Sequence, residues 1–299
     1  DTGELTVWAS SQAPHLFRTV LAGVLSLDEE KIRVIVPDVG GGFGVKLHYY
    51  PEDVLVAVAA MRLGRPVKWV ETRAEHFAAT VHAREQRVHA RAAFDAQGAL
   101  LALRAHVQGD VGAHLHTKGA GPIFLGGIVL PNVYAVRHFK ARLEAVVTNK
   151  VPFGAYRAFG MQQAAFVTER LMDIAAARLG IDPAKIRRRN YVTPAAFPYR
   201  SAANLVYDSG NYESALDEAL RIADYKGLRT IRARARAEGR LVGIGLANYV
   251  EVTGMGPSKL MAAMGNRQGG YESAAVRVEP SGRVTVATGI IEVGQGIRS

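Results

Sequence analysis

Three short loops in this sequence combine glycines with one residue that could take part in chemistry. The first loop, Gly40 to Gly44, follows a β-branched run and reads Gly-Gly-Gly-Phe-Gly. The second, Gly154 to Gly160, sets Arg157 between two aromatic residues, and the third, Gly294 to Gly296, sets Gln295 between two glycines. Glycine lets the backbone adopt positive φ and lets a ligand approach closely. Each loop could therefore hold a ligand through its backbone.

The first loop leaves two interpretations open. Several successive amides after a strand could form a nest for phosphate or for the polar groups of an organic cofactor. The alternative is a tight turn that places Phe43 in the core. The glycine spacing matches neither the P-loop nor the dinucleotide-binding fingerprint. The residues of this loop therefore fit a binding loop and a structural turn equally well.

The other two loops each offer one polar side chain. Arg157 could hold an anion or stabilise negative charge that develops on a substrate oxygen. The alternative is a surface arginine stacked on a tyrosine. Gln295 can both donate and accept hydrogen bonds, which suits the edge of an amide-like heterocycle, although glutamine between glycines also occurs in ordinary turns.

Several other chemistries are excluded or unsupported. The chain has no cysteine, so it forms no disulfide, thiolate zinc site, cysteine nucleophile or iron–sulfur cluster of its own. The histidines show no metal-binding spacing on a helix. His114 and His116 could share one face of a strand, but no acidic partner is evident, so this pair reads as a polar strand end. No Gly-x-Ser-x-Gly elbow is present.

Composition and charge indicate a folded protein. The chain has 299 residues with 48% hydrophobic and 21% charged residues, which suits one large mixed domain or two ordinary ones. It has no apolar run long enough for a membrane span and no signal-peptide pattern, so a cytoplasmic location is expected. The net charge of +10 would suit nucleic acid, but the densest basic run, residues 229–236 with Arg240, reads as a solvated helix face. No nucleic acid is therefore expected.

Hydrophobic periodicity and Pro or Gly signals predict an α+β fold in which antiparallel pairing outnumbers βαβ units. Residues 255–270 are either a loop or a segment that crosses to another part of the molecule. The predicted helices cover residues 14–25, 51–63, 162–179, 212–223 and 228–238, with a shorter one after Asp182. The predicted strands cover residues 5–8, 31–36, 67–71, 138–148 and 242–252, with hairpins at 84–94/100–109 and 274–279/283–291.

Taken together, the loops resemble the ordered motifs of one family. The segments Trp8 to His15, Val39 to Lys46, Gly154 to Gly160 and Glu292 to Gly296 look like those of the xanthine dehydrogenase, aldehyde oxidase and aerobic carbon monoxide dehydrogenase large subunits. Four motifs in the right order are far more specific than any one of them. Three connecting segments, residues 64–69, 187–190 and 207–210, also resemble the sequences of this family.

The resemblance implies a mixed α+β molybdopterin-binding fold with mixed sheets, antiparallel hairpins and packed helices. Residues 1–240 would form a first molybdopterin-binding domain, and residues 241–299 would start a second, truncated one. The cofactor would be molybdenum on a molybdopterin, in the dinucleotide form, and the pterin rather than the protein would hold the metal. By the motif match, Arg157 would be catalytic, and the cofactor-binding residues would be Gly41, Gly42, Phe43, Gly44, Gly294, Gln295 and Gly296.

The implied activity is hydroxylation of a small organic substrate, an aldehyde or N-heterocycle, with oxygen from water. Electrons would pass to iron–sulfur clusters and FAD on partner chains, an iron–sulfur subunit and an FAD subunit. The family's general-base glutamate lies in a later region that this sequence lacks. Another chain, or a missing C-terminal part of the subunit, would have to supply it. The alternative is a truncated, non-catalytic homologue that binds cofactor or assists assembly.

Three departures from the family pattern narrow these expectations. Members that oxidise carbon monoxide carry a cysteine in the Arg157 loop, where this sequence has Ala158, so carbon monoxide is disfavoured as substrate. Purine-type members carry a glutamate soon after the first loop, and residues 46–48 provide none. The histidine and threonine that usually follow Gly-Gln-Gly are replaced by Ile297 and its neighbours.

Overall fold

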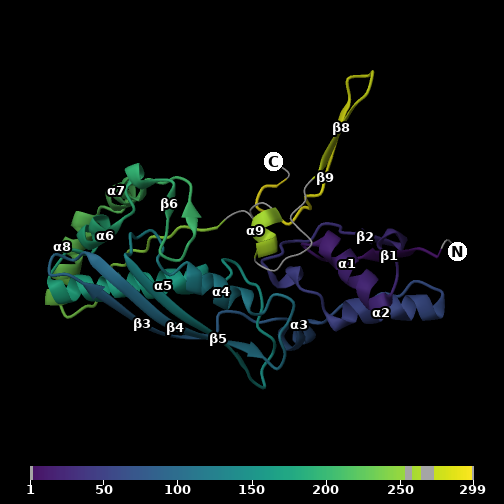
Figure 1. Ribbon diagram of the computed structural model, residues 1–299, viewed down its shortest axis with the longest axis horizontal. Helices are drawn as coiled ribbons and strands as arrows, with labels where there is room; N and C mark the ends of the chain where they lie inside the picture. Colours follow the sequence, from purple (N-terminus) through teal and green to yellow (C-terminus); the bar gives the residue numbers. More distant parts are fainter. Residues whose placement is uncertain (1–2, 253–257, 264–272, 298–299) are drawn as a thin grey trace. The chain divides into compact units, whose positions relative to one another are not determined.

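The computed structural model describes residues 3–252, 258–263 and 273–297, which Figure 1 draws as a ribbon. The chain forms two compact units. Unit 1 combines Asp1–Ala78 with Glu251–Ser299, and unit 2 is Ala79–Val250. Each unit has a hydrophobic cluster of its own. The first loop and the Gln295 loop belong to unit 1, and the Arg157 loop belongs to unit 2.

Unit 1 opens with a strand, a helix and a second strand parallel to the first. Strand β1 (Leu5–Trp8) pairs with β2 (Ile32–Ile35), and helix α1 (Pro14–Leu25) connects them. Proline has no N–H group, so at the first helical position it leaves no donor unpaired, and its φ already has the helical value. At the other end of α1, Ser26 adopts the left-handed conformation. These elements confirm the predicted helix at 14–25 and the strand predicted near 31–36.

The next part of unit 1 holds one confirmed element and one error. Helix α2 (Pro51–Leu63) is the helix predicted at 51–63, but residues 67–71 form no strand within the described chain. A capping box follows them, in which the Thr72 amide donates to Glu75 Oε2 over 2.6 Å and the Glu75 amide donates to Thr72 Oγ1 over 3.2 Å. This reciprocal pair satisfies two free amides and starts α3 (Arg73–Ala79). The segment is therefore the lead-in to a helix.

The C-terminal part of unit 1 contains the predicted hairpin. Strands β8 (Ala274–Val278) and β9 (Val284–Thr288) pair antiparallel, and every residue of both strands is exposed. Helix α9 (Ser258–Ala263) precedes them. The two alternatives predicted for residues 255–270 otherwise lie outside the described residues.

Unit 2 is organised around a three-stranded mixed sheet. Its central strand β4 (Leu100–Gly112) pairs antiparallel with β3 (Gln86–Phe94) and parallel with β5 (His138–Val147). The predicted hairpin and the predicted strand at 138–148 are thereby confirmed. Helices α4 (Gly121–Ile128) and α5 (Met161–Leu179) contact one face of this sheet, as Figure 1 shows.

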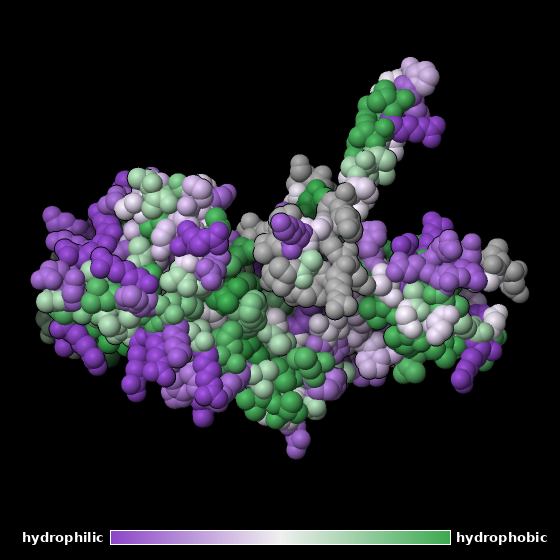
Figure 2. Space-filling view, viewed as in Figure 1, coloured by the Kyte–Doolittle hydropathy of each residue, from purple (hydrophilic) through white to green (hydrophobic). Residues whose placement is uncertain are grey.

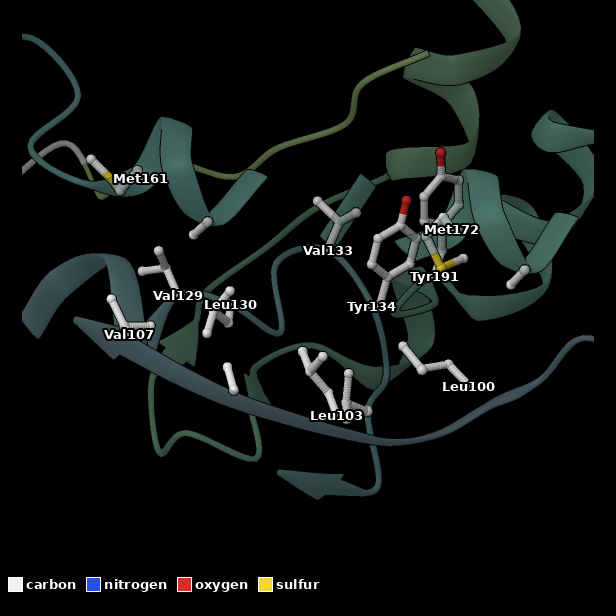
Figure 3. Packing of buried hydrophobic residues seen from close by; sticks show 14 of the residues in the cluster. Leu100, Leu103, Val107, Val129, Leu130, Val133, Tyr134, Met161, Met172 and Tyr191 are labelled. Carbon is white, nitrogen blue, oxygen red and sulfur yellow. The ribbon is translucent and has the colours of Figure 1, made fainter. Parts of the chain in front are cut away.

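The core of unit 2 lies between this sheet and the helices. Figure 3 shows Leu103 and Val107 of β4 pointing toward Leu130 and its neighbours. The rings of Tyr134 and Tyr191 stack with their centroids 5.8 Å apart. Because every second β4 side chain turns inward, the other half of the strand faces away from the core.

Helix α4 was not predicted, because its sequence, Gly-Pro-Ile-Phe-Leu-Gly-Gly-Ile, is poor in helix formers. Its glycines are explained by close packing. A Cβ added at Gly127 would lie 2.3 Å from Leu143 of β5, and one at Gly126 would lie 2.9 Å from the Gly160 carbonyl oxygen. The glycines let this helix approach both the sheet and the loop that carries Arg157.

Residues 242–252 were predicted to be a strand, and this is wrong. No strand pairs with them in the described chain; side chains of unit 2 hold their backbone instead. Arg187 Nη2 donates to the Leu246 carbonyl over 3.0 Å. Asn132 Nδ2 donates to the Asn248 carbonyl over 2.7 Å, and the Val250 amide donates to Asn132 Oδ1 over 3.1 Å. The alternating pattern therefore does not form a strand here, because side chains and not a neighbouring strand bind this backbone.

Arg187, from the Arg-Arg-Arg-Asn phrase, is the centre of a buried polar network. Its side chain is fully buried and donates from Nε to Glu169 Oε2 over 2.8 Å and from Nη2 to Asp173 Oδ1 over 2.9 Å. Tyr134 donates to the other oxygen of the Glu169 carboxylate. Burial raises the pKa of Tyr134, and the Glu169 charge raises it further. A buried charge is tolerated only when it is paired in this way. Arg187 of this motif therefore has a structural role in unit 2.

The remaining elements complete the α+β architecture. The predicted helices near 162–179, 183–190, 212–223 and 228–238 are confirmed within a few residues. No described helix is long and apolar enough to cross a membrane. These elements are α6 (Pro183–Asn190), β6 (Tyr199–Arg200), β7 (Val206–Tyr207), α7 (Tyr212–Ile222) and α8 (Tyr225–Ala237).

Candidate functional site

The first loop has an unusual backbone for its composition. Phe43 has φ +52° and lies between two glycines with positive φ, Gly41 at +98° and Gly44 at +102°. A bulky residue in this region is a rare, strained conformation. Its ring is 57% exposed, so the interpretation that Phe43 fills the core is wrong. The strain and the exposure favour the binding interpretation.

Two residues hold the first loop in place. Gln12 Oε1 accepts a hydrogen bond from the Gly44 amide over 2.9 Å, and the Gln12 amide donates to the Lys46 carbonyl over 3.0 Å. Lys46 Nζ in turn donates to the Val39 carbonyl across the mouth of the loop. Burial lowers the pKa of Lys46, with the Glu71 carboxylate acting in the opposite direction. Gln12, between β1 and α1, thus holds the Gly44–Lys46 end of the loop, and Lys46 ties that end to Val39.

The loop keeps backbone donors available. Among the described residues, the amides of Gly40, Gly41, Gly42 and Phe43 make no hydrogen bond. Unpaired amides need water or a ligand as partner. Gly42 is buried, and a Cβ there would lie 2.6 Å from Gln12 Oε1, so no side chain fits between loop and support. This set of neutral N–H donors fits phosphate, pterin or oxo acceptors.

The second loop is held by helix α4 and by Arg84. Its residues Ala158 and Phe159 have φ +71° and +44°. The ring of Phe159 lies where a Cβ at Gly121 would be, at 2.4 Å. A Cβ at Gly160 would lie 2.0 Å from the Pro122 carbonyl oxygen. The loop therefore keeps its strained backbone because it is pressed against α4.

Arg84 supports the outer side of the second loop. Its guanidinium lies 4.5 Å from the centroid of the Tyr156 ring, and Nη2 donates to the Arg157 carbonyl over 3.2 Å. The arginine stacked on tyrosine is thus Arg84, and the alternative that assigned this contact to Arg157 is wrong. The Arg157 side chain is exposed and has no ion pair or hydrogen bond within the described chain. Its charge is free to meet a ligand.

The third loop repeats the left-handed backbone. Gln295 has φ +61° between Gly294 at +94° and Gly296 at +73°. The Gly294 amide donates to Glu292 Oε1 over 2.7 Å, and the Ile297 amide donates to the Gly294 carbonyl over 3.3 Å. Gln295 is exposed and makes no hydrogen bond among the described residues. Each of the three loops thus places at least one non-glycine residue at positive φ.

The structure places supporting side chains at the first and second loops but does not link Gln295 or Arg157 to the first loop within the described residues. It brings Gln12 and Lys46 to the first loop and Arg84 to the second. It shows no hydrogen bond between Gln295 and the first loop, and Arg157 belongs to the other unit. No group of three or more His, Cys, Asp or Glu residues that could hold a metal ion occurs in the part of the chain that the structure describes.

Three supporting residues were not recognised in the sequence. Gln12 lies inside the Trp8 to His15 motif, so the motif itself was the signal for it. Lys46 ends the Val39 to Lys46 motif in the same way. Arg84 lies in no motif, and nothing near it in sequence indicates its contact with a loop 73 residues away.

Comparison with known proteins agrees with this geometry. Residues 1–191 match the family model of a molybdopterin cofactor-binding domain, and residues 218–299 match a second model of the same description. The chain therefore belongs to the molybdopterin cofactor-binding domain family. This confirms the resemblance to the molybdenum hydroxylase large subunits and the mixed α+β fold class.

Particular relatives sharpen the comparison. The chain is 38% identical over 302 residues to the carbon monoxide dehydrogenase large chain of Hydrogenophaga pseudoflava, covering 98% of this chain and 37% of that protein. It is 35% identical over 295 residues to the nicotine 6-hydroxylase large subunit of Paenarthrobacter nicotinovorans, covering 98% of this chain and 36% of that protein. The solved quinoline 2-oxidoreductase of Pseudomonas putida 86 matches with TM-score 0.92 and 37% identity, over 98% of this chain and 37% of that one. The chain thus spans little more than a third of these relatives.

Proposed function

We propose that this chain is the cofactor-cradling portion of a molybdenum hydroxylase that oxidises an aldehyde or an N-heterocycle. The observation that carries the proposal is the strained first loop with its four unpaired amides, in a chain of the molybdopterin-binding family. When bound, molybdenum on a molybdopterin dinucleotide supplies two-electron oxidation of a substrate carbon, with the oxygen coming from water.

The first loop binds the cofactor through its backbone. Amides of Gly41, Gly42, Phe43 and Gly44 are assigned to the acceptors around the metal, and Gln12 and Lys46 keep the loop from closing on itself. The Gly44 amide already donates to Gln12 Oε1, so Gln12 must release it or share it. The other three amide donors are fixed and unpaired before the ligand arrives, so their binding needs little reorganisation.

Arg157 is assigned to the substrate. An exposed guanidinium without a partner can orient a substrate and stabilise negative charge on its oxygen or ring nitrogen. Arg84 fixes the backbone of Arg157 and leaves its side chain free. Ala158 follows where carbon monoxide-oxidising members would carry a cysteine, which favours an organic substrate. Relatives named for nicotine, quinoline and aldehyde oxidation support that choice.

The third loop is assigned to the pterin. The Gln295 amide can donate to and accept from the edge of the pterin ring, and Gly294 and Gly296 let that ring approach the backbone. The proposal includes an iron–sulfur subunit, an FAD subunit and a chain or segment with the rest of the large subunit. It keeps the domain boundary at residues 240 and 241 and the cytoplasmic location.

Cofactor content tests the proposal directly. The chain is expressed in a host that makes the molybdenum cofactor, and molybdenum and pterin are measured per polypeptide. Stoichiometric amounts of both are expected, with a clear loss in Gln295→Ala and none in Gln97→Ala, an exposed glutamine of the β3–β4 turn. A wild-type chain without metal and pterin, although folded by far-UV circular dichroism, would overturn the proposal.

Turnover tests the role of Arg157. In the assembled enzyme, Arg157→Ala is expected to lower kcat by roughly 10²–10³-fold, the effect of removing one charge-stabilising donor. Arg178→Ala removes an exposed arginine of α5 and should leave kcat unchanged. Full turnover in Arg157→Ala would show that the assignment is wrong. Bound cofactor with no turnover in any assembled form would favour a non-catalytic, cofactor-binding homologue.

A further inference from the structure

The face of the β3–β4–β5 sheet that turns away from α4 and α5 carries an unusual set of side chains. Figure 2 shows hydrophilic side chains gathered where Figure 1 places β3 and β4. We call this surface the outer sheet face. It consists of Arg87, His89, Arg91, Arg104, His106, Gln108, Lys140, Arg142 and Glu144.

Strand register arranges these residues in rows across the three strands. The first row is Arg91, Arg104 and Lys140, in which each residue is the direct neighbour of the next. The second row is His89, His106 and Arg142, and the third is Arg87, Gln108 and Glu144. Side chains directly opposite one another are separated by only about 5 Å at Cβ, and like charges there are destabilising. A row of three cations therefore weakens the sheet that carries it.

Most of this charge is not neutralised within the chain. In the part of the chain that the structure describes, Arg87, Arg91, Arg104 and Lys140 have no carboxylate within ion-pair distance. Glu144 is the single carboxylate in these three rows, and Asp110, at the next outward position of β4, is engaged by Lys150 over 3.3 Å. Glu144 is engaged by Arg142 and by His106 Nε2 at 2.8 Å. The cations at the other end of the face remain exposed and unpaired.

The helical side of unit 2 shows that such pairing is available to this chain. Arg188 is paired with Asp217, and Arg229 with Asp182. Arg234 pairs with Glu238 over 2.9 Å. The basic run in α8 is thus partly neutralised by neighbouring carboxylates, whereas the first row of the outer sheet face, Arg91, Arg104 and Lys140, is not. The outer sheet face therefore holds three adjacent unpaired cations in one row.

A shallow cavity of about 480 Å³ lies within the outer sheet face. Its lining includes His89, Arg91, Arg104 and His106. These residues line one depression together with Val88, Ala90 and Ala105. An arginine guanidinium can bind a carboxylate through two parallel hydrogen bonds. The cavity gives the face a defined point at which an acidic side chain can be seated.

We propose that the outer sheet face docks a carboxylate-rich surface of a partner subunit, with an acidic side chain in this cavity. The inference rests on the proposed function, because relatives named as a large chain or as subunit gamma of a complex imply partner chains. Arginine outnumbers lysine four to one here, which suits protein interfaces, where Arg is enriched and Lys depleted. The nine residues of the face include no Phe, Tyr or Trp on which a nucleic-acid base could stack.

Binding of a labelled oligoglutamate peptide, followed by fluorescence anisotropy, tests this docking surface. Arg91→Glu, Arg104→Glu and Lys140→Glu together should lower the affinity on the order of tenfold or more, since close charge pairs become repulsive. The control combines Arg189→Glu, Arg232→Glu and Arg236→Glu, which reverse exposed, unpaired charges on the helical side. Little change is expected there. Equal losses in both triple variants, or none in the first, would overturn the proposal.

Two further measurements keep the result unambiguous. Replacement of Arg91, Arg104 and Lys140 by glutamine should weaken peptide binding and yet raise the unfolding midpoint, because it removes like-charge repulsion. A lowered midpoint would mean that this row stabilises the folded chain. Duplex DNA that binds more tightly than the peptide and depends on the same row would replace the acidic partner by nucleic acid. Molybdenum and pterin content should be unchanged in these variants, so failure of the cofactor proposal is seen separately.

Discussion

The first loop and the second loop solve the same structural problem in different ways. Both hold a non-glycine residue at positive φ, Phe43 at +52° in one and Ala158 at +71° in the other. The first loop is held by polar groups, since Gln12 accepts from one of its amides and Lys46 spans its mouth. The second is held by contact, since its backbone is pressed against the glycines of α4.

This difference suits what each loop is proposed to bind. A loop held by a few hydrogen bonds keeps its other amides free for a ligand, as the first loop does. A loop held by packing fixes one exposed side chain at a set position, as the second loop does for Arg157. Polar support can be exchanged one hydrogen bond at a time, whereas packing against backbone fails when any atom is added. The two loops should therefore respond to mutation with different magnitudes.

The largest effect is expected at Gly160. It has φ +100°, and a Cβ there would lie 2.0 Å from the Pro122 carbonyl oxygen, which cannot move without shifting α4. Gly160→Ala combines backbone strain with overpacking and should lower the free energy of unfolding by about 2–5 kcal/mol. Gly180→Ala at the other end of α5, with φ +66° and nothing within 4 Å, isolates the strain at about 1–2 kcal/mol. Urea titration followed by circular dichroism measures both, and equal costs would refute the packing account.

An intermediate effect is expected at Gly42, and it should depend on Gln12. A Cβ at Gly42 meets the end of the Gln12 side chain, which can move aside but loses its hydrogen bond to the Gly44 amide. Gly42→Ala should therefore cost about 1 kcal/mol. In a Gln12→Ala background the same change should cost close to nothing. The fluorescence of Trp8 and Trp69, both in unit 1, follows unfolding; additive costs in the double variant would contradict the coupling.

The sequence predicted what depends on neighbours along the chain. Helices α1 and α2 begin at Pro14 and Pro51 and end near residues that adopt the left-handed conformation, so local signals sufficed. The glycines of the three loops were recognisable for the same reason. The strand predicted from the alternation in residues 242–252 was wrong. Their hydrogen-bond partners are the side chains of Asn132 and Arg187, which are far away in the sequence.

Long-range support could not be predicted. The glycines of α4 predict against a helix, and only the packing of Gly126 against Gly160 explains why they occur there. Gln12 reaches a loop 32 residues away, and Arg84 one 73 residues away. A motif can draw attention to Gln12 without showing its contact. For Arg84 the sequence carries no local signal at all, so that residue is found only in three dimensions.

A smaller effect is expected at Arg84, whose side chain supports the second loop through a hydrogen bond and a cation–π contact. Arg84→Ala removes the stack on Tyr156 and the hydrogen bond to the Arg157 carbonyl. Both are exposed, so the free energy of unfolding should fall by only about 0.5–1 kcal/mol. Hydrogen exchange of the Phe159 amide, which donates to the Tyr156 carbonyl over 2.8 Å, should nevertheless accelerate, while Arg137→Ala, another exposed arginine, leaves it unchanged. Unaltered exchange in Arg84→Ala would show that Arg84 does not hold the loop.

The smallest effect is the pH dependence of stability, which should differ between the two units. Unit 2 should respond at acidic pH and unit 1 at alkaline pH. In unit 2, hydrogen bonds from Thr148 and the Gly112 amide lower the pKa of Asp110, with a further contribution from Lys150. A depressed carboxyl pKa stabilises the fold above the ordinary value of 3.8, and this contribution is lost as the pH falls through the folded-state pKa. In unit 1, burial lowers the pKa of Lys46 from 10.5. The unfolded chain then binds the proton more strongly, so stability rises with pH between the lowered pKa and 10.5.

Paired titrations can test this separation of the two units. Asp110→Asn should reduce the acid sensitivity of the circular dichroism signal without altering tryptophan fluorescence, since both tryptophans lie in unit 1. Lys46→Met should abolish the alkaline gain seen by fluorescence and leave the acid limb unchanged. If both variants shifted both signals, the two loops would be energetically coupled through the whole chain. The contrast between polar and packed support would then describe one cooperative structure in place of two independent ones.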